Sequence, residues 1–260
     1  MTVDLDKLRM KYTQLEKVFS GGDNFMNKFF QVADGTNMIR ILPSSDEDTE
    51  FYAETKIHRI NLPNEGGEMM AKNVHCRSMH GEPCPLCDAY RGLWKTDSKA
   101  DEDRAREIKP RSRFYMNIVD RNTGEVKILS VGIMLFQKIV AAMLDEDYGD
   151  ITDLQTGHDF KIVKVQEGRW PKYDQSAPRP KPSTAGSEAE VATWMDSLHD
   201  IADLVKLEEY EEVKTYAQNI LPTLTYEQTV ERPVPEVSTE TTDDSSITET
   251  DEDYLARLKA

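Results

Sequence analysis

Three cysteines lie within a twelve-residue stretch, and this cluster constrains the fold more than any other feature of the chain. Cys76, Cys84 and Cys87 are the only cysteines among 260 residues, so they cannot all pair as disulfides within one chain. The spacing of Cys84 and Cys87 lets two thiolates occupy adjacent corners of a zinc tetrahedron, and Cys76 supplies a third thiolate. The cluster therefore excludes a secreted disulfide scaffold and favours one structural Zn²⁺.

The fourth zinc ligand should be a histidine, and three histidines are candidates. His75 adjoins Cys76, so the two side chains would have difficulty converging on one ion, and His80 lies in the short loop that must wrap around the metal. His58 ends a candidate strand that returns toward the cysteines through the loop at 61–73. We therefore predict His58 as the fourth ligand. A Cys₃His site has no open coordination position, which makes it structural rather than catalytic.

One motif in the same block is shared with an enzyme class. His80-Gly-Glu82 followed by Pro83-Cys84-x-x-Cys87 contains the letters of the zinc deaminase signature. In that signature the two halves begin separate helices and a strand-sized insert divides them, whereas here they adjoin. His80 and the two cysteines could not frame an open pocket with Glu82 as a proton shuttle. We therefore predict no enzymatic activity.

Most of the chain from residue 24 to residue 166 has the pattern of short strands. Asn122 to Gly124 is typical of a hairpin turn. The candidate strands are 37–43, 50–62, 113–120, 125–132 and 158–168, and residues 135–145 read as a short helix. This pattern predicts a mainly β chain with added helices (α+β), folded as an antiparallel barrel or sandwich.

The following segment changes from strands to a loop and then to helices. Residues 169–186 contain four prolines and four basic residues against one acid, which predicts an irregular basic loop. Ser187 and Glu190 form a capping box for a helix that carries apolar residues as far as Val205. A second helix is expected from Tyr210 to Pro222.

The formal net charge of −16 is distributed unevenly along the chain. Residues 1–183 hold 27 Lys and Arg against 29 Asp and Glu, whereas residues 184–260 hold 5 against 19. The first two-thirds could therefore carry a basic groove although the whole chain is acidic. Residues 227–260 are rich in acidic residues, Ser and Thr and have few large apolar side chains, which predicts a disordered tail.

The N-terminal residues form an amphipathic helical pattern. Apolar side chains recur at three- and four-residue steps through residues 3–19, and Gly21-Gly22 ends the pattern. The helix could pack on its own domain or dock on a neighbouring molecule as a detachable arm. The chain start lacks the features of a signal peptide, and no stretch reaches the roughly 18 apolar residues of a membrane span.

Three segments combine basic residues with aromatic rings. Residues 104–115 hold five basic residues and one acid and end in Phe114-Tyr115, whose side chains should point to opposite faces of a strand. Cations contact phosphates and exposed rings stack on unpaired bases, so the combination favours single-stranded nucleic acid over ordinary core aromatics. The candidate ssDNA-binding residues are Arg40, Trp94, Lys109, Arg111, Arg113, Tyr115, Arg169, Trp170, Lys172 and Tyr173.

Several of these motifs resemble the single-stranded DNA-binding, helix-destabilising proteins of T-even bacteriophages. They are Ile39-Arg-Ile-Leu-Pro-Ser44, the zinc block 76–87 with His58 upstream, Arg113-Phe-Tyr-Met-Asn-Ile118, and the stretch from Phe160 to Ser176. The resemblance implies an OB-fold-type barrel with an inserted zinc-binding subdomain and an aromatic-lined basic cleft. It also implies His58 as the fourth zinc ligand and Trp94, Tyr115, Trp170 and Tyr173 as DNA-facing rings.

The resemblance completes an expected domain plan. Residues 1–22 form an arm for cooperative self-association, and residues 227–260 form an acidic tail that binds replication and recombination proteins. The ssDNA-binding core at 23–226 contains the zinc subdomain at about 56–95 and a helical segment at 187–221. The expected function is sequence-independent, cooperative coating of ssDNA in phage DNA replication, recombination and repair, in the cytoplasm of the infected host cell. The alternative is a zinc-ribbon module for protein or RNA interaction.

Overall fold

The computed structural model describes residues 25–46, 49–64, 66–96, 98–168 and 170–220. All of them belong to one compact unit, Met1–Leu224. The predicted arm at 1–22 and the predicted acidic tail at 227–260 lie outside the described residues. Among the helices of the described part, none has the length and apolar character needed to cross a membrane.

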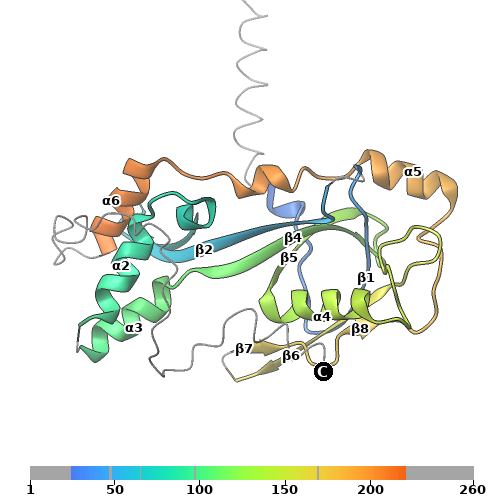
Figure 1. The fold of residues 1–260 in the computed structure, drawn as a ribbon, viewed down its shortest axis with the longest axis horizontal. Coiled ribbons are helices and arrows are strands. Elements are labelled where there is room, and N and C mark those ends of the chain that lie inside the picture. Colours follow the sequence, from blue (N-terminus) through green and yellow to red (C-terminus); the bar gives the residue numbers. More distant parts are fainter. Residues whose placement is uncertain (1–24, 47–48, 65, 97, 169, 221–260) are drawn as a thin grey trace, which may run out of the picture. The chain divides into compact units, whose positions relative to one another are not determined.

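An antiparallel sheet forms the centre of this unit (Figure 1). The strand order is β3-β2-β4-β1-β6-β7, with β5 paired to β4 and β8 paired to β6. The sheet is a half-barrel with several helices around it, so the predicted mainly β fold with added helices is confirmed. The strands are β1 (Gly35–Ile41), β2 (Tyr52–Pro63), β3 (Met69–His75), β4 (Arg111–Asp120), β5 (Val126–Gly132), β6 (Phe160–Glu167), β7 (Trp170–Lys172) and β8 (Ala177–Pro178).

Strand β4 connects the half-barrel to a second group of elements. Its first residues pair with β2, its last residues pair with β1, and β5 occupies the opposite edge. Because β2 is longer than its pairing with β4, it continues beyond the half-barrel and pairs there with β3. Figure 1 shows β2 running toward the end of the molecule that holds α2 (Pro85–Trp94), α3 (Lys99–Ile108) and α6 (Tyr210–Ile220).

The β4–β5 hairpin confirms the predicted turn. Gly124 has a φ of +73°, a conformation that favours glycine, and its N–H donates to the Asp120 carbonyl at 2.7 Å. The other predicted strands correspond to β1, β2 and β6, and the predicted short helix corresponds to α4 (Ile133–Leu144).

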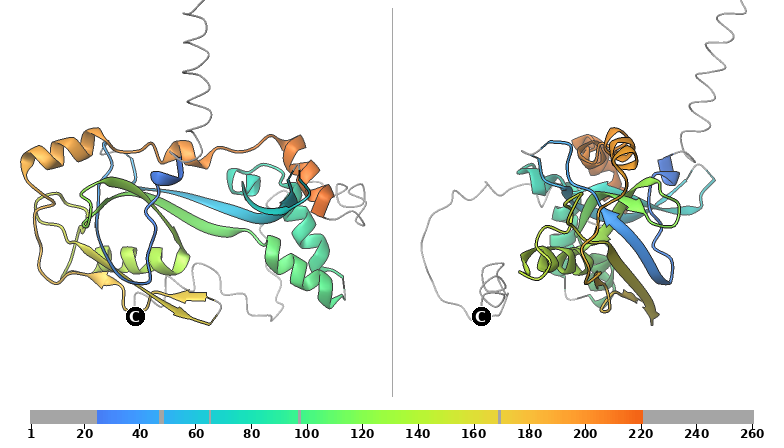
Figure 2. Two further views of the ribbon diagram at one scale, coloured as in Figure 1. Left: turned by 180° about the vertical axis from the view of Figure 1, so that it is seen from behind. Right: turned by 90° about the vertical axis from the view of Figure 1, so that its right-hand side faces the viewer.

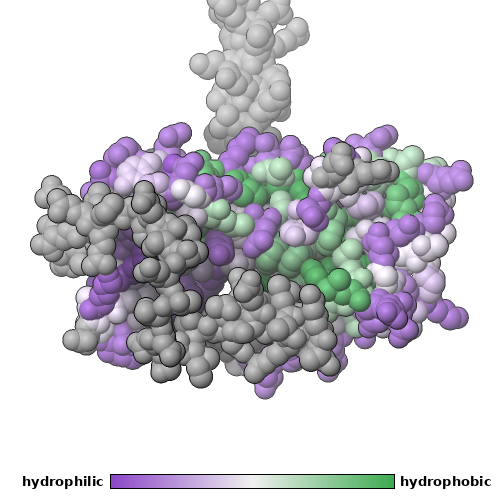
Figure 3. Space-filling model, in the orientation of Figure 1, coloured by the Kyte–Doolittle hydropathy of each residue, from purple (hydrophilic) through white to green (hydrophobic). Residues whose placement is uncertain are grey.

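Alternate residues of β4 face the core of the half-barrel. Phe114, Met116 and Ile118 belong to a buried apolar cluster with residues of β1, β5, β6 and α4. The Phe114 ring stacks on Phe136 of α4 with centroids 3.7 Å apart, so α4 closes this face of the sheet (Figure 2). The outer side of α4 leaves Met134 and other apolar side chains exposed, and Figure 3 shows them gathered over this helix.

A second buried cluster lies at the end of β2. It joins apolar residues of β2 and β3 to α2, α3 and α6, and its centre includes the three cysteines. Since the described apolar residues form separate clusters, the half-barrel and this end of the molecule have their own cores.

Three predicted elements differ from the structure. The loop at 61–73 is shorter than predicted, because β2 extends to Pro63 and β3 begins at Met69. The loop at 169–186 contains the short strands β7 and β8, because the free edge of β6 pairs with both. The capping box of Ser187 and Glu190 is confirmed, but its helix, α5, spans only Glu188–Asp196 instead of continuing to 205. Asn117 binds the backbone of His199 through two hydrogen bonds, which hold the chain out of a helix there.

Candidate metal centre and nucleic-acid interface

The structure brings four side chains singled out by the sequence into one buried cluster. The ligand atoms of His58, Cys76, Cys84 and Cys87 all lie within 4.8 Å of one another. His58 Nε2 is 3.6 Å from Cys84 Sγ and 3.5 Å from Cys87 Sγ, and Cys76 Sγ is 3.4 Å from Cys87 Sγ. Bond lengths of about 2.3 Å for Zn–S and about 2.0–2.1 Å for Zn–N put tetrahedral ligand atoms about 3.5–3.8 Å apart. The cluster could therefore hold a metal ion and is consistent with structural zinc.

Local structure explains how the cysteines meet. Cys84 is the N-cap of α2 in an extended conformation, and Pro85 occupies the first helical position, where its missing N–H costs nothing. The helix then turns Cys87 back beside Cys84. Cys76 follows β3 directly, and its N–H donates to the Lys56 carbonyl of β2 at 2.7 Å. This bond extends the β2–β3 ladder and carries Cys76 to the strand that holds His58.

The surroundings of His58 orient its ring toward the cysteines. Its Nδ1 is 2.7 Å from the Ile108 carbonyl, to which Nδ1–H donates, so Nε2 faces the thiols as in metal-bound histidines. Burial lowers the pKa of His58, but hydrogen bonds with Cys76, Cys84 and the carbonyl outweigh it and raise the pKa to about 9. Hydrogen bonds from Cys76 and Cys87 hold the pKa of the Cys84 thiol far below its ordinary value. The pocket thus favours the thiolate form of Cys84, which is the form that binds a metal.

The two other candidate histidines lie outside this cluster. His75 Nδ1 is 3.0 Å from Thr55 Oγ1, and His80 is exposed. Glu82, the acid of the deaminase-like motif, forms an ion pair with Arg77. His80 and Glu82, the first half of the deaminase-like motif, therefore do not belong to the cluster that contains Cys84 and Cys87.

Trp94 is the last residue of α2 and is 40% exposed. The Arg106 guanidinium carbon of α3 lies 5.5 Å from its ring centroid, a cation–π geometry. No sequence pattern distinguished Arg106 from the other cations of the basic run at 104–115. Glu102 and Asp103 of α3 form ion pairs with Arg106, which reduces the positive electrostatic potential that Arg106 contributes to this surface.

The junction of α3 and β4 carries the next candidates. Lys109 and Arg111 are exposed, and Arg113 and Tyr115 are half-buried on the face of β4 opposite Phe114. The prediction that Phe114 and Tyr115 point to opposite faces is confirmed. Burial raises the pKa of Tyr115, while Arg113 lowers it by less.

Phe29 belongs to the same face, although no sequence pattern indicated it. Its ring centroid is 6.4 Å from that of Tyr115 in an edge-to-face arrangement. The contact depends on a parallel bridge between Phe29 and Ile128, which joins residues far apart in the chain.

The third group follows β6. Arg169 lies outside the described residues, and Trp170 and Lys172 are the first and last residues of β7. Lys172 is exposed and its Nζ is 2.5 Å from a carboxylate oxygen of Glu167. Tyr173 is half-buried and packs against the core of the half-barrel. Apart from Arg40, the described candidates therefore occupy three segments: the end of α2, the α3–β4 junction, and β7 with the residue that follows it.

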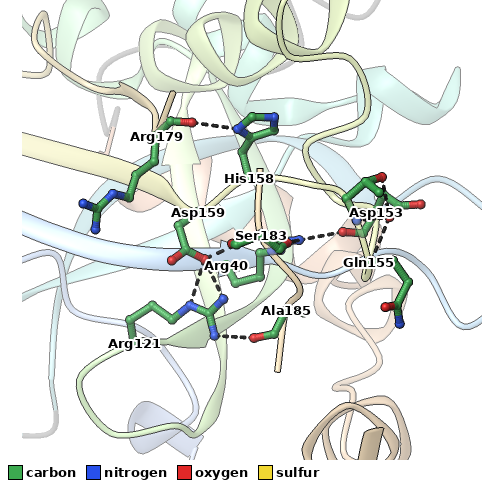
Figure 4. Close-up of polar contacts among 10 residues, drawn as sticks. Arg40, Arg121, Asp153, Gln155, His158, Asp159, Arg179, Ser183 and Ala185 are labelled. Carbon is green, nitrogen blue, oxygen red and sulfur yellow. Dashed lines mark hydrogen bonds and ion pairs between the residues drawn. The ribbon is translucent and has the colours of Figure 1, made fainter. Parts of the chain in front are cut away.

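Arg40 does not belong to this surface, and its prediction as a DNA contact is wrong. Its side chain is 0% exposed. Arg40 Nη2 donates to the carbonyl oxygens of Asp153 at 2.6 Å and Ser183 at 2.9 Å (Figure 4). The reason is that the segments containing these two carbonyls cover the face of β1 that carries Arg40.

A second arginine joins the same network. Asp159 Oδ1 is 3.6 Å from Arg40 Nη1 and 2.6 Å from Arg121 Nη2, and Arg121 Nη1 donates to the Ala185 carbonyl. Burial lowers the pKa of Arg40, and Asp159 partly offsets this effect. The backbone packs so closely that a Cβ at Gly157 would lie 2.4 Å from the Asp153 carbonyl oxygen and 2.9 Å from Arg40 Nη2. Arg40 thus holds the segment after β8 against the sheet.

The chain was compared with known proteins. Residues 33–221 match the model of a family described as gp32 DNA binding protein like, a range that includes every described strand and all four cluster residues. No curated protein matches the sequence. The family match supports single-stranded DNA binding and confirms the resemblance to T-even phage proteins. Because it covers well over half of the sequence, the chain belongs to the gp32 DNA binding protein like family.

Proposed function

We propose that this protein coats single-stranded DNA without sequence preference. The observation that carries the proposal is the row of Lys109, Arg111 and Arg113, which leads along one face of β4 to Tyr115. Within the described part of the chain, Lys109 and Arg113 form no ion pair, so both are available to phosphates. Tyr115 and the exposed Trp94 present rings on which bases can stack. Every base has a flat aromatic face that can stack on these rings, so stacking accounts for binding without sequence preference.

Zinc has a structural role in this proposal. His58, Cys76, Cys84 and Cys87 would hold it, and the bound ion would cross-link β2, the end of β3 and α2. The four ligands leave no open coordination position, so the proposal includes no catalytic step. Trp94 ends the same helix that begins at this cluster, and the metal would thereby fix the position of a stacking residue.

The family and the charge distribution support a proposal for the biological role. We infer that coating serves phage DNA replication, recombination and repair in the cytoplasm of the infected host cell. Residues 1–22 would provide self-association along the strand, and the acidic tail at 227–260 would recruit partner proteins. A zinc-dependent protein or RNA module is the alternative. Titration with poly(dT), poly(U) and duplex DNA at several salt concentrations separates the two, since phosphate binding has a steep salt dependence.

Trp94→Ala is expected to weaken binding to poly(dT) by about 1–3 kcal/mol, because one stacked base is lost. Fluorescence anisotropy of labelled DNA, which does not depend on the emission of the protein's own tryptophans, measures the change. Met134→Ala is the matched control, since Met134 is an exposed apolar side chain of α4 outside the candidate segments. An equal loss in both variants would contradict the assignment of Trp94.

Deletion of residues 1–20 is expected to preserve binding to a short oligonucleotide and to weaken clustered binding on long strands. The amphipathic pattern and the following Gly21-Gly22 motivate this expectation. Binding isotherms on both lengths of DNA provide the measurement. Equal losses on short and long strands would indicate that the helix belongs to the core.

Deletion of residues 227–260 is expected to strengthen binding to ssDNA, most clearly at low salt. This segment holds ten acidic residues against three basic ones, and a tethered polyanion competes efficiently for a basic surface on its own chain. The affinity of full-length and truncated protein is compared across a salt series. Identical affinities at every salt concentration would restrict the tail to protein docking or solubility.

A further inference from the structure

A hollow of about 320 Å³ opens between β1, β6 and the segment at β8. Its lining is Met38, Lys161, Pro178, Arg179 and Pro180. The neighbours of Met38 and Lys161 in the chain, such as Ile39 and Phe160, belong to the core of the half-barrel. Because side chains alternate along a strand, Met38 and Lys161 face the other side of the sheet, and the hollow lies on that outer face.

The backbone around this hollow is held in place by hydrogen bonds. Lys161 pairs with Met38 on one side and with Ala177 on the other. Arg179 N–H donates to the Asp159 carbonyl at 2.8 Å, and the Arg179 carbonyl lies 2.7 Å from His158 Nδ1 (Figure 4). The prolines on either side of Arg179 further restrict the backbone. The hollow is therefore formed before any ligand enters.

Two cationic side chains in the hollow have no anionic partner among the described residues. Neither Lys161 Nζ nor the Arg179 guanidinium forms an ion pair or hydrogen bond with another described residue. Asp159 precedes Lys161 by two positions, but its carboxylate is already shared by Arg40 and Arg121. Figure 4 shows the Arg179 guanidinium extending outside the network that its backbone joins. The hollow thus combines positive charge with the apolar surfaces of Met38 and two prolines.

The register of the sheet relates this hollow to a predicted DNA-binding segment. Val165 lies on the same face of β6 as Lys161, four residues further along, or about 13 Å at about 3.3 Å per residue. Lys172 of β7 pairs with Val165, so it stands on that face as well. Val165 is 47% exposed beside Lys172, whereas Val163, which lies on the same face between Val165 and Lys161, is buried.

We propose that the hollow binds one nucleotide unit of single-stranded DNA and extends the binding surface beyond β7. Lys161 and Arg179 contact the phosphate, and Met38 with the prolines contacts the sugar or base. This assignment rests on the proposed function, the binding of ssDNA. A strand running along the outer face of β6 meets Lys172 and Val165 side by side and then, beyond the buried Val163, the cations and apolar side chains of the hollow.

The test is the full-length Lys161→Gln/Arg179→Gln variant, titrated with oligo(dT) of about 4 to about 16 nucleotides, the range of site sizes for related folds. On the longest oligonucleotides, the loss of two phosphate contacts should reduce the salt slope by about 1.4 and weaken binding roughly 10- to 30-fold near 0.1 M salt. The shortest oligonucleotides, which need not reach the hollow, should bind almost as tightly as to the wild type. Lys206→Gln is the control, because Lys206 is exposed and pairs locally with Asp203.

The outcomes separate this assignment from the proposed function. If the wild type binds ssDNA and the variant binds long oligonucleotides with the same affinity, the nucleotide site is wrong and the proposed function remains. If the wild type does not bind ssDNA, both are wrong. Equal losses at every length would also overturn the nucleotide site, because the two cations would then belong to the primary surface. If the variant binds DNA normally but no longer responds to removal of residues 227–260, the occupant is the acidic tail and the proposal is wrong. Thermal unfolding of Arg179→Gln alone should match the wild type, since its exposed side chain joins no described contact.

Discussion

Replacement of Cys84 by serine is expected to abolish zinc binding and to lower the free energy of unfolding by about 5 kcal/mol or more. Structural zinc contributes about 10–16 kcal/mol of binding free energy in small zinc domains, and this energy is coupled to folding. Cys84 is buried beside the three other ligands, and its side chain makes no capping hydrogen bond to α2, so the expected loss comes from the metal site. The cluster formed by β2, β3, α2, α3 and α6 should lose its order first, because the cysteines lie in its core.

Metal analysis and thermal unfolding of the purified protein measure this effect. His80→Gln is the matched control, because His80 lies in the same loop but is exposed and outside the ligand cluster. It should retain one zinc per chain and an unchanged midpoint. Retention of zinc by Cys84→Ser, or its loss in His80→Gln, would refute the ligand set.

Arg40→Met is expected to destabilise the protein by about 3–5 kcal/mol, the usual effect of removing one partner from a buried charged pair. The Ser183 carbonyl would lose its donor, the Asp153 carbonyl would keep only the Gly157 N–H, and Asp159 would keep only Arg121. Since Arg40 is fully buried, the salt slope of ssDNA binding by the folded protein should not change.

Denaturant unfolding and a salt-dependent titration distinguish a structural arginine from a phosphate contact. Lys109→Gln provides the opposite case, with unchanged stability and a salt slope reduced by about 0.7 for one lost contact. If Arg40→Met reduced the salt slope and left stability unchanged, the buried position of Arg40 would be wrong.

Features that depend on short sequence separations were predicted well. The cysteine spacing identified three residues of the cluster, because a turn followed by a helix start determines how Cys84 and Cys87 approach each other. The β4–β5 hairpin and the capping box of α5 likewise depend on a few adjacent residues. His58 was chosen among three histidines because it ends a candidate strand, and its approach to the cysteines depends on the β2–β3 pairing.

Features that depend on distant segments were not predicted. Alternation along β1 puts Arg40 on the face opposite Ile39 and Ile41, but it does not show that distant segments cover that face. The helix predicted to reach residue 205 ends at Asp196, because hydrogen bonds from Asn117 hold His199.

The ligand types of the metal cluster, the antiparallel strands and the segments rich in basic and aromatic residues could be predicted from the amino-acid sequence, since they depend on composition, spacing and alternation. The exposure of those residues became clear from the folded chain. Arg40 is buried, Trp94 is accessible, and Lys161 and Arg179 meet at one hollow. The physical reason is that exposure depends on what packs over a side chain, and in this fold the covering segments come from parts of the chain more than one hundred residues away.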